Sequence, residues 1–278
     1  MTPHQLADLA ERLARGAGAL LRAKLDEART VDFKGTGRSN LVTDADHAAE
    51  ALVLEALARE VPQHGVLAEE SGAVREAGTT WILDPLDGTT NYAHGVPHFC
   101  VSLAVEQPVD GATRVVAGVV YDPMRDELFR AVRGGGATVN GKRLVASPTA
   151  TLDRALLCTG FPYDLQQRPE APLGLFNRLV QRAQGIRRMG SAALDLAYVA
   201  AGRFDGFFEF GLKPWDIAAG ALLIEEAGGH IARIDGAPWD VRFGDVVAGS
   251  PGLFPSLAEQ TAAFVKDIGW TPRRFSGS

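Results

Sequence analysis

A chain of 278 residues, with 46% apolar and 22% charged residues, has the composition of a globular protein with a sizeable buried core. Its formal net charge of −6 excludes the broad attraction to nucleic acid or anionic membranes that basic proteins show, so we expect neither as a partner. No apolar run reaches the about 18 residues that span a bilayer, and the first residues lack a signal-peptide core, which indicates a cytoplasmic protein.

The two cysteines, Cys100 and Cys158, both lie within apolar runs. A disulfide framework needs more cysteines and an oxidising compartment. We therefore expect two buried, reduced thiols.

The first half of the chain alternates between helix and strand patterns. Apolar residues from Leu6 to Leu21 recur at helical spacing and predict an amphipathic helix that ends at about Leu25. Glycines between Val31 and Asn40 indicate a loop or hairpin turn, and a second helix is predicted from about Asp46 to Glu60. The predicted strands are Trp81–Leu83 and, as an antiparallel meander with short turns, Phe99–Val105, Val115–Tyr121 and Glu127–Val132.

The second half repeats this alternation. Its predicted strands are Ala155–Thr159, Phe207–Phe210, His230–Ile234 and Val246–Ala248. Its predicted helices are Pro172–Gln184, Ser191–Ala201, Asp216–Ala227 and Pro255–Val265. No repeat or long linker separates the halves, so we expect one domain over residues 1–278, with halves that meet near residue 145. Helices layered on mainly antiparallel sheet give an α+β fold.

Acidic residues gather around the strand at Trp81. Glu69 and Glu70 precede it, and Asp84 and Asp87 follow it. Carboxylates this close repel one another unless a cation neutralises them, and hard oxygen ligands favour Mg²⁺. The alternative is a solvated acidic turn, since Asp, Pro and Gly are common turn residues. That alternative weakens because a buried strand precedes the turn and another apolar strand follows its Thr-Thr-Asn tail.

Three further polar residues have both a structural and a functional interpretation. Asp216 stands where a helix N-cap would lie, a role worth about 1 kcal/mol, yet the small residues after it would let the helix bring it close to Asp84 and Asp87. Ser191 is either an N-cap or a ligand for substrate hydroxyls, and both can hold. Glu209 lies in the apolar strand FFEFG, where an acid is usually solvated at an edge.

These motifs together resemble the inositol monophosphatase family. WILDPLDGTTN matches its first motif and WDIAAGALLIEEAGG its second, while NLVTDAD, LAEES and the segment from Arg187 to Asp216 match in order and spacing. The resemblance covers about Leu6 to Leu257. It implies a layered αβαβα sandwich and hydrolysis of a phosphate monoester with two or three Mg²⁺ ions.

The resemblance also assigns roles to residues. One ion would be held by Glu69, Asp84 and the Leu86 carbonyl, a second by Asp84, Asp87 and Asp216, and a weaker third by Glu69 and water. Asp46 would accept a hydrogen bond from Thr89, and this pair with Glu69 would orient and deprotonate the attacking water. Lys34 corresponds to a family lysine near the third ion. Amides at Gly88 and Thr89 would bind phosphate, and Gly190, Ser191, Ala192 and Glu209 would bind the substrate hydroxyls.

The resemblance favours inositol 1-phosphate as substrate. Alternatives with the same metal chemistry are fructose 1,6-bisphosphate, histidinol phosphate and 3′-phosphonucleotides, and a different one is a non-catalytic role in RNA synthesis. Family members are commonly homodimers, and we expect the same here.

Two weaker patterns point elsewhere. His94 and His98 have the spacing of helical metal ligands, but Gly95 and Pro97 between them favour a loop or packing role. Arg187 and Arg188 form a small basic spot that could be a solvated face, a dimer contact or a site for an acidic partner.

Overall fold

The computed structural model describes residues 1–25, 31–33, 41–72, 74–75 and 78–275. Its helices are α1 (Pro3–Lys24), α2 (Asp44–Glu60), α3 (Thr89–Ala93), α4 (Glu170–Val180), α5 (Ala192–Ala200), α6 (Pro214–Glu226) and α7 (Phe254–Asp267), with a 3₁₀ turn at Leu152–Arg154. None of the helices in these ranges has both the length and the apolarity needed to cross a bilayer.

The strands form two main sheets and one small hairpin. The larger sheet has the order β10-β9-β8-β7-β6-β5-β3-β4 and comprises β3 (Gly65–Ala68), β4 (Val74–Arg75), β5 (Thr80–Asp87), β6 (Cys100–Val109), β7 (Ala112–Asp122), β8 (Glu127–Val132), β9 (Gly136–Val139) and β10 (Lys142–Arg143). The smaller sheet has the order β12-β11-β13-β15-β14 and comprises β11 (Leu156–Thr159), β12 (Gly185–Arg187), β13 (Gly206–Glu209), β14 (His230–Arg233) and β15 (Val246–Gly249). The hairpin pairs β1 (Val31–Phe33) with β2 (Leu41–Thr43).

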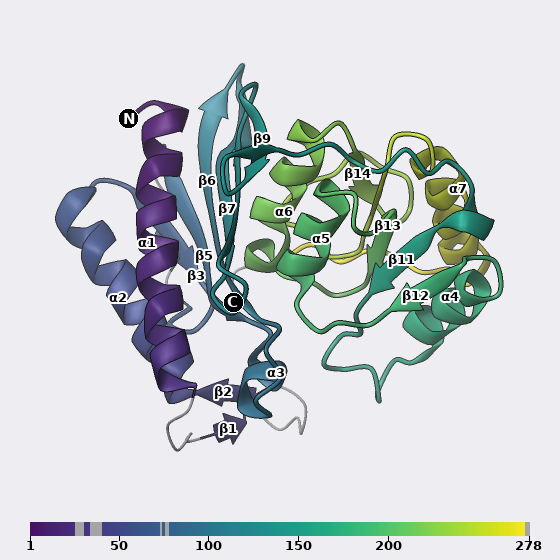
Figure 1. Cartoon of the computed structure of the whole chain (residues 1–278). Helices are drawn as coiled ribbons and strands as arrows, with labels where there is room; N and C mark the ends of the chain where they lie inside the picture. The colour runs from purple at the N-terminus through teal and green to yellow at the C-terminus, as the bar shows by residue number, and fades with distance from the viewer. Residues whose placement is uncertain (26–30, 34–40, 73, 76–77, 276–278) are drawn as a thin grey trace.

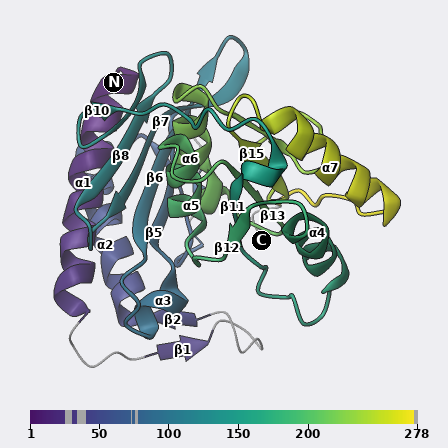
Figure 2. The same ribbon diagram turned by 45° about the vertical axis from the view of Figure 1, so that its right-hand side comes forward.

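Helices and sheets alternate in five layers. Figure 1 shows α1 and α2 on the outer face of the larger sheet, α5 and α6 between the two sheets, and α4 and α7 beyond the smaller sheet. The turned view in Figure 2 keeps the same order. The α+β class and the αβαβα order predicted from the sequence are therefore confirmed.

The outer layer follows from the amphipathic pattern of α1. Thr2 caps the helix, and its side chain and that of Gln5 bond reciprocally to each other's backbone amides. Apolar residues from Leu6 to Leu21 are buried at helical spacing against the larger sheet. Burial of each leucine contributes about 1.5–3 kcal/mol, which fixes this layer on the sheet.

The middle layer depends on small residues. A Cβ on Gly118 of β7 would lie 3.0 Å from Ala219 Cα, and a Cβ on Gly220 would lie 2.5 Å from Leu196 Cβ of α5. Helix α6 can therefore press closely against both the larger sheet and α5. The Ser102 hydroxyl of β6 donates to the Trp215 carbonyl at 3.0 Å, which fixes the start of α6 at the end of β5 and β6.

Most predicted elements are present, with shifts of a few residues. The three-strand meander and the buried free thiols of Cys100 and Cys158 are confirmed. The expectation of mainly antiparallel pairing holds for the larger sheet, whereas in the smaller one β11 pairs in parallel with both β12 and β13. The predicted loop or hairpin turn from Val31 to Asn40 begins with β1, and its residues 34–40, including Lys34, lie outside the described residues.

Candidate functional site

The segment Asp84–Asp87 forms the last part of β5 and turns there. Strand β5 pairs with β6 up to Asp84 opposite Ser102, then the register shifts so that Asp87 lies opposite Cys100. Asp84 Oδ1 accepts a hydrogen bond from the Leu86 amide at 3.0 Å, which closes the turn. Both carboxylates therefore leave the sheet at the same end.

Gly88 ends this turn in a conformation that other residues avoid. Its φ of 101° is in the left-handed region, and a Cβ there would lie 3.0 Å from the His98 carbonyl oxygen and 3.2 Å from Phe99 Cα. The close passage lets α3 begin directly beside Asp87. It also leaves the backbone next to the carboxylates uncovered by a side chain.

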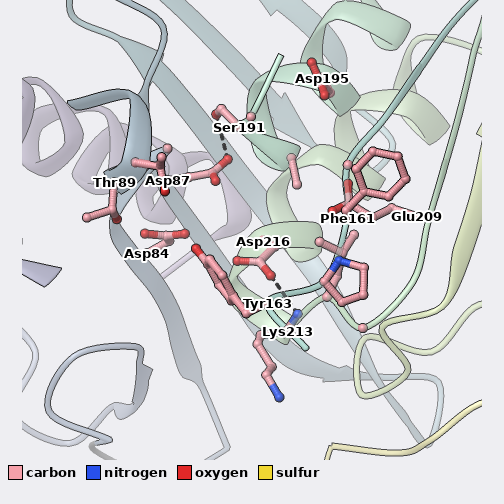
Figure 3. Close-up of a pocket in the computed structure, with 18 of the residues that line it drawn as sticks. Asp84, Asp87, Thr89, Phe161, Tyr163, Ser191, Asp195, Glu209, Lys213 and Asp216 are labelled. Carbon is pink, nitrogen blue, oxygen red and sulfur yellow. Dashed lines mark hydrogen bonds between the residues drawn. The ribbon is translucent and has the colours of Figure 1, made fainter. Parts of the chain in front are cut away.

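Asp87, at the end of β5, is hydrogen-bonded to the start of α5, the helix that lies between the two sheets. Its Oδ2 accepts hydrogen bonds from the Ser191 hydroxyl at 2.7 Å and the Ala193 amide at 2.7 Å (Figure 3). Ser191 is the N-cap residue of α5 by position, but its side chain makes no capping hydrogen bond. The predicted N-cap position of Ser191 is therefore confirmed, but the Asp87 carboxylate replaces its hydroxyl as the cap, because Asp87 accepts from the Ala193 amide that a capping hydroxyl would bind.

Asp216 lies inside the first turn of α6. The helix begins at Pro214 with Lys213 as N-cap, so the prediction that Asp216 is itself the N-cap is wrong. The shift arises because Pro214 suits the first helical position, where its missing N–H costs nothing. Asp216 Oδ2 accepts from the Lys213 amide at 2.7 Å, and its carboxylate faces the Asp84–Asp87 turn (Figure 3).

A buried acid of α2 positions the loop that carries Glu69. The Glu50 carboxylate, 3% exposed, accepts from the Glu70 amide at 2.8 Å and from the Ser71 amide at 2.7 Å. The Glu69 amide itself donates to the Leu83 carbonyl at 3.2 Å. The loop is thus tied both to α2 and to β5. Glu50 carries no signal in the sequence, since a single acid within a predicted helix is usually solvated.

Thr89 and Asp46 form a buried pair. The Thr89 hydroxyl lies 3.1 Å from Asp46 Oδ1 and 3.1 Å from the Leu86 carbonyl, so it can donate to either. Asp46 also accepts from the Thr43 amide at 2.8 Å, and this contact holds it in place at the start of α2. The predicted hydrogen bond between Thr89 and Asp46 is present.

The carboxylates of the site carry charges of the same sign and lie close together where little water reaches them. Burial is the largest cause that raises the pKa of Asp84, Asp87 and Asp216, and repulsion among them and from Glu69 raises each pKa further. Hydrogen bonds from Ser191 and Ala193 offset part of the rise in the pKa of Asp87. The described residues contain no group of three or more Asp, Glu, His or Cys side chains already arranged to hold a metal ion.

This donor set nevertheless fits a hard divalent cation. Asp84, which is buried, lines one pocket with Glu69 and the half-buried Asp87 and Asp216, and repulsion within the group raises the pKa of the three aspartates in the absence of positive charge. Asp87 and Asp216 each direct an oxygen to an amide or hydroxyl donor, and Asp84 directs one to the Leu86 amide. Oxygen ligands without cysteine or histidine are those that Mg²⁺ prefers.

The opposite wall of the pocket carries Glu209, an acid close to a cation. Glu209 ends β13, an interior strand, and is only 7% exposed, so the usual interpretation of a solvated edge acid does not apply. Burial raises its pKa to about 8, although Arg188 acts in the opposite direction. A Cβ on Gly160 would lie 2.2 Å from Glu209 Oε1, so only glycine at position 160 leaves room for this carboxylate.

The predicted residues meet in one cavity of about 250 Å³ between the two sheets (Figure 3). Its walls include Glu69, Asp84, Leu86, Asp87, Gly88, Thr89, Gly190, Ser191, Ala192, Glu209 and Asp216. Asp46 lies behind Thr89, at 0% exposure.

Several residues that line this cavity were not predicted as parts of it, among them Arg188, Asp195 and Tyr163. Arg188, which the sequence left open among three roles, lines the cavity beside Glu209. Asp195 is 1% exposed, and its Oδ1 has no hydrogen-bond partner within the described part of the protein. Tyr163 directs its hydroxyl toward Asp84 and Asp216 in Figure 3, and nothing in its loop sequence indicated this. His98, by contrast, packs against Tyr198 and takes no part in the cavity, as the loop interpretation predicted.

Comparisons with known proteins agree with the geometry. The sequence pattern that defines the inositol monophosphatase family matches residues 2–268. The chain is 45% identical over 256 residues to Nus factor SuhB of Escherichia coli K12, which covers 91% of this chain and 94% of that protein. A crystal structure of extragenic suppressor protein suhB from Bartonella henselae superposes with a TM-score of 0.85 at 38% identity and covers 92% of this chain and 98% of that one. Inositol monophosphatase from Anabaena superposes with a TM-score of 0.81 at 42% identity and covers 92% and 95%, respectively.

Proposed function

Since the chain belongs to the inositol monophosphatase family, we propose that it is a Mg²⁺-dependent phosphomonoesterase that hydrolyses inositol 1-phosphate to inositol and phosphate. The observation that carries the proposal is the cluster of Glu69, Asp84, Asp87 and Asp216 in one cavity, where burial and mutual repulsion raise the pKa of the three aspartates. A protein that only binds partners has no need of such mutually repelling buried acids.

The proposed ligands of the ions are the carboxylates of Glu69, Asp84, Asp87 and Asp216 and the Leu86 carbonyl. When bound, Mg²⁺ supplies positive charge that offsets the charge on the phosphoryl oxygens and makes water a better nucleophile. The number of ions, two or three, follows from the family resemblance alone.

Thr89 and Asp46 are proposed to orient the attacking water. When the Thr89 hydroxyl donates to Asp46 Oδ1, its oxygen lone pairs face the cavity and can accept a proton from water. Asp46 can in turn take up the proton that Thr89 releases, and burial raises its pKa, which favours this uptake. The amides of Gly88 and Thr89, uncovered because Gly88 has no side chain, are proposed to bind phosphate oxygens.

The polyol is proposed to lie against the opposite wall. Glu209, the start of α5 at Gly190 to Ala192, and Arg188 surround this part of the cavity. Ser191 is proposed to act here through its backbone, because its hydroxyl is already bound to Asp87. A buried acid whose pKa is raised is stabilised by a donor, and a substrate hydroxyl is such a donor.

The direct test is phosphate release from inositol 1-phosphate by Asp84→Asn and Asp216→Asn proteins with Mg²⁺. We expect each to lose on the order of 10²-fold or more in kcat/KM, because a carboxylate that binds the ion is gone. Glu70→Gln is the matched control, since Glu70 lies beside Glu69 but does not line the cavity. Rates near wild type in either Asp variant, or an equal loss in the control, would overturn the assignment.

The choice of inositol over related substrates needs a panel. Inositol 1-phosphate, fructose 1,6-bisphosphate, histidinol phosphate and a 3′-phosphonucleotide separate the alternatives by kcat/KM. The proposal expects the highest value for inositol 1-phosphate. The expected homodimer is a separate prediction that sedimentation velocity would check.

A second candidate is a role in RNA synthesis. It is supported by the name of the relatives, Nus factor SuhB, which 45% identity connects to this chain. From the net charge we expected that nucleic acid is not a partner. The similarity to Nus factor SuhB argues against that expectation. Co-purification of RNA polymerase with the Asp84→Asn protein, at wild-type yield, would support a role that is independent of hydrolysis; loss of the complex would oppose it.

A further inference from the structure

Residues 269–275, here called the tail, follow the residues that the family pattern matches and end against the start of α6. The match ends at residue 268, and the structure describes the chain as far as Phe275. The Phe275 ring meets the Trp215 ring edge-on, with centroids 5.5 Å apart and an interplanar angle of 81°. Both rings are half-buried and pack against the hydrophobic core that contains α5 and α6. The tail therefore contacts the residue that directly precedes Asp216.

A second contact joins the tail to the residue whose amide binds Asp216. Lys213 Nζ lies 5.6 Å from the centroid of the Phe275 ring, which is a cation–π contact. The amide of the same lysine donates to Asp216 Oδ2 at 2.7 Å (Figure 3). One aromatic ring thus contacts the side chains of Lys213 and Trp215, and the backbone of these two residues determines where the Asp216 carboxylate lies.

The backbone of the tail is itself attached to the larger sheet. The Phe275 amide donates to the Arg242 carbonyl at 2.6 Å, and the Arg242 guanidinium donates to Glu106 Oε2 of β6 at 3.0 Å. Because Glu106 is buried, loss of this ion pair would leave a charge without its partner, so the pair holds Arg242 on β6. The same strand binds the Trp215 carbonyl through Ser102. The start of α6 is therefore attached to β6 twice, directly through Ser102 and indirectly through the tail.

The beginning of the tail is anchored away from Asp216. Trp270 Nε1 donates to Asp245 Oδ2 at 2.8 Å, and the Trp270 ring meets the Phe210 ring edge-on with centroids 5.3 Å apart. Phe210 directly follows Glu209, the last residue of β13. The two half-buried aromatic residues of the tail therefore contact different walls of the candidate active site, Trp270 the wall of Glu209 and Phe275 the wall of Asp216.

We infer that Phe275 is a positioning residue, which holds Trp215 and Lys213 so that the Asp216 carboxylate is in place for a divalent cation before the cation binds. The inference rests on the proposed function, because it takes Asp216 as a ligand of Mg²⁺. A ligand that its supporting residues fix in advance loses less conformational entropy when the ion binds. Loss of such support commonly costs about 10–100-fold in metal affinity. Phe275 acts through two neighbours of the ligand, so we expect the lower end of this range.

The alternative is that the tail only stabilises the fold. A half-buried ring removes apolar surface from water wherever it lies, and this contribution has no direction. The two interpretations differ in what they predict for Mg²⁺. A purely stabilising tail raises the melting temperature of the metal-free protein and leaves its affinity for Mg²⁺ unchanged, whereas a positioning residue changes the affinity.

The test is calorimetric titration of Mg²⁺ into metal-free wild type, Phe275→Leu and Trp270→Leu proteins. Each variant removes one half-buried ring of the tail, so Trp270→Leu is the matched control for lost packing. We expect the Kd for Mg²⁺ to rise about tenfold in Phe275→Leu and by less than about twofold in Trp270→Leu. Phe275→Tyr keeps the ring and should return the Kd to within about twofold of wild type. Equal changes in the two leucine variants, or no change in either, would overturn the inference.

A double-mutant cycle shows whether the effect passes through Asp216. In an Asp216→Asn protein the ligand that Phe275 positions is gone, so Phe275→Leu should change the remaining Mg²⁺ affinity by less than about twofold. An undiminished loss in that background would place the effect elsewhere and overturn the inference. The same titrations separate the inference from the proposed function. Wild type that binds Mg²⁺ with an affinity independent of Phe275 removes the inference alone, whereas wild type that binds no Mg²⁺ removes both.

Discussion

The two walls of the candidate active site differ in how their charges are compensated. On one wall the buried Asp84 lies with the half-buried Asp87 and Asp216, and repulsion among these carboxylates raises their pKa values. On the other wall Glu209 is the buried acid at the strand end, and Arg188 opposes the rise in its pKa. Under the proposed function a cation completes the first wall, whereas the second wall binds neutral hydrogen-bond donors of the substrate. This difference supports the proposed division, in which β5 and α6 carry the chemistry while β13 and α5 carry substrate recognition.

The largest expected effect concerns Thr89, on the catalytic wall. Thr89→Val keeps the shape of the side chain but removes the hydroxyl that contacts Asp46, so we expect kcat to fall on the order of 10²–10⁴-fold. Thr89→Ser restores the hydroxyl and should recover most of the rate. Mg²⁺ affinity measured by calorimetry should be similar in all three proteins. A Thr89→Val protein with wild-type kcat would remove Thr89 from water activation.

A smaller effect is expected from Glu209→Gln, on the recognition wall. The amide keeps the size of the acid but offers substrate hydroxyls a weaker acceptor, so KM for inositol 1-phosphate should rise about tenfold. We expect kcat to stay within about threefold, because Glu209 is not among the proposed metal ligands. Steady-state kinetics would check this, and a fall in kcat at constant KM would contradict the division between the walls.

The smallest effect is a pH dependence of stability that Glu209 causes. Its pKa is raised from 4.5 to about 8 in the folded protein, so folding favours the protonated form. The stability this contributes is fully present below pH 4.5 and is lost as pH rises toward about 8. In Mg²⁺-free buffer, wild type should therefore lose more melting temperature than Glu209→Gln over this range. Parallel curves for the two proteins would show that Glu209 ionises freely.

Sequence analysis predicted the residues on the wall of Asp84, Asp87 and Asp216 more completely than those on the wall of Glu209. Asp84, Asp87 and Thr89 lie within one short motif on one strand, so their proximity follows from local structure. Ser191 and Asp216 were found, but their hydrogen bonds were not, because these depend on a carboxylate from a distant strand and on a proline that moves a helix start.

Residues that depend on tertiary packing could not be foreseen. Glu50 acts through the backbone of a loop twenty residues away, and Tyr163 reaches the cavity from a loop with no motif. Arg188 lies in a matched segment, but the sequence does not show which way its side chain points. The interior position of Glu209 follows from parallel pairing of β11 with β13, which strand patterns alone do not specify.

The most direct test of the central claim, that the carboxylate wall is built to be completed by Mg²⁺, is the melting temperature of wild type and Asp84→Asn with and without Mg²⁺. Without Mg²⁺ at pH 8, Asp84→Asn should melt higher than wild type, because one buried repelling carboxylate is gone while the hydrogen bond to the Leu86 amide is kept. Saturating Mg²⁺ should raise wild type above the variant, because binding to the folded state alone stabilises it. A wild-type melting temperature that Mg²⁺ leaves unchanged would contradict the account.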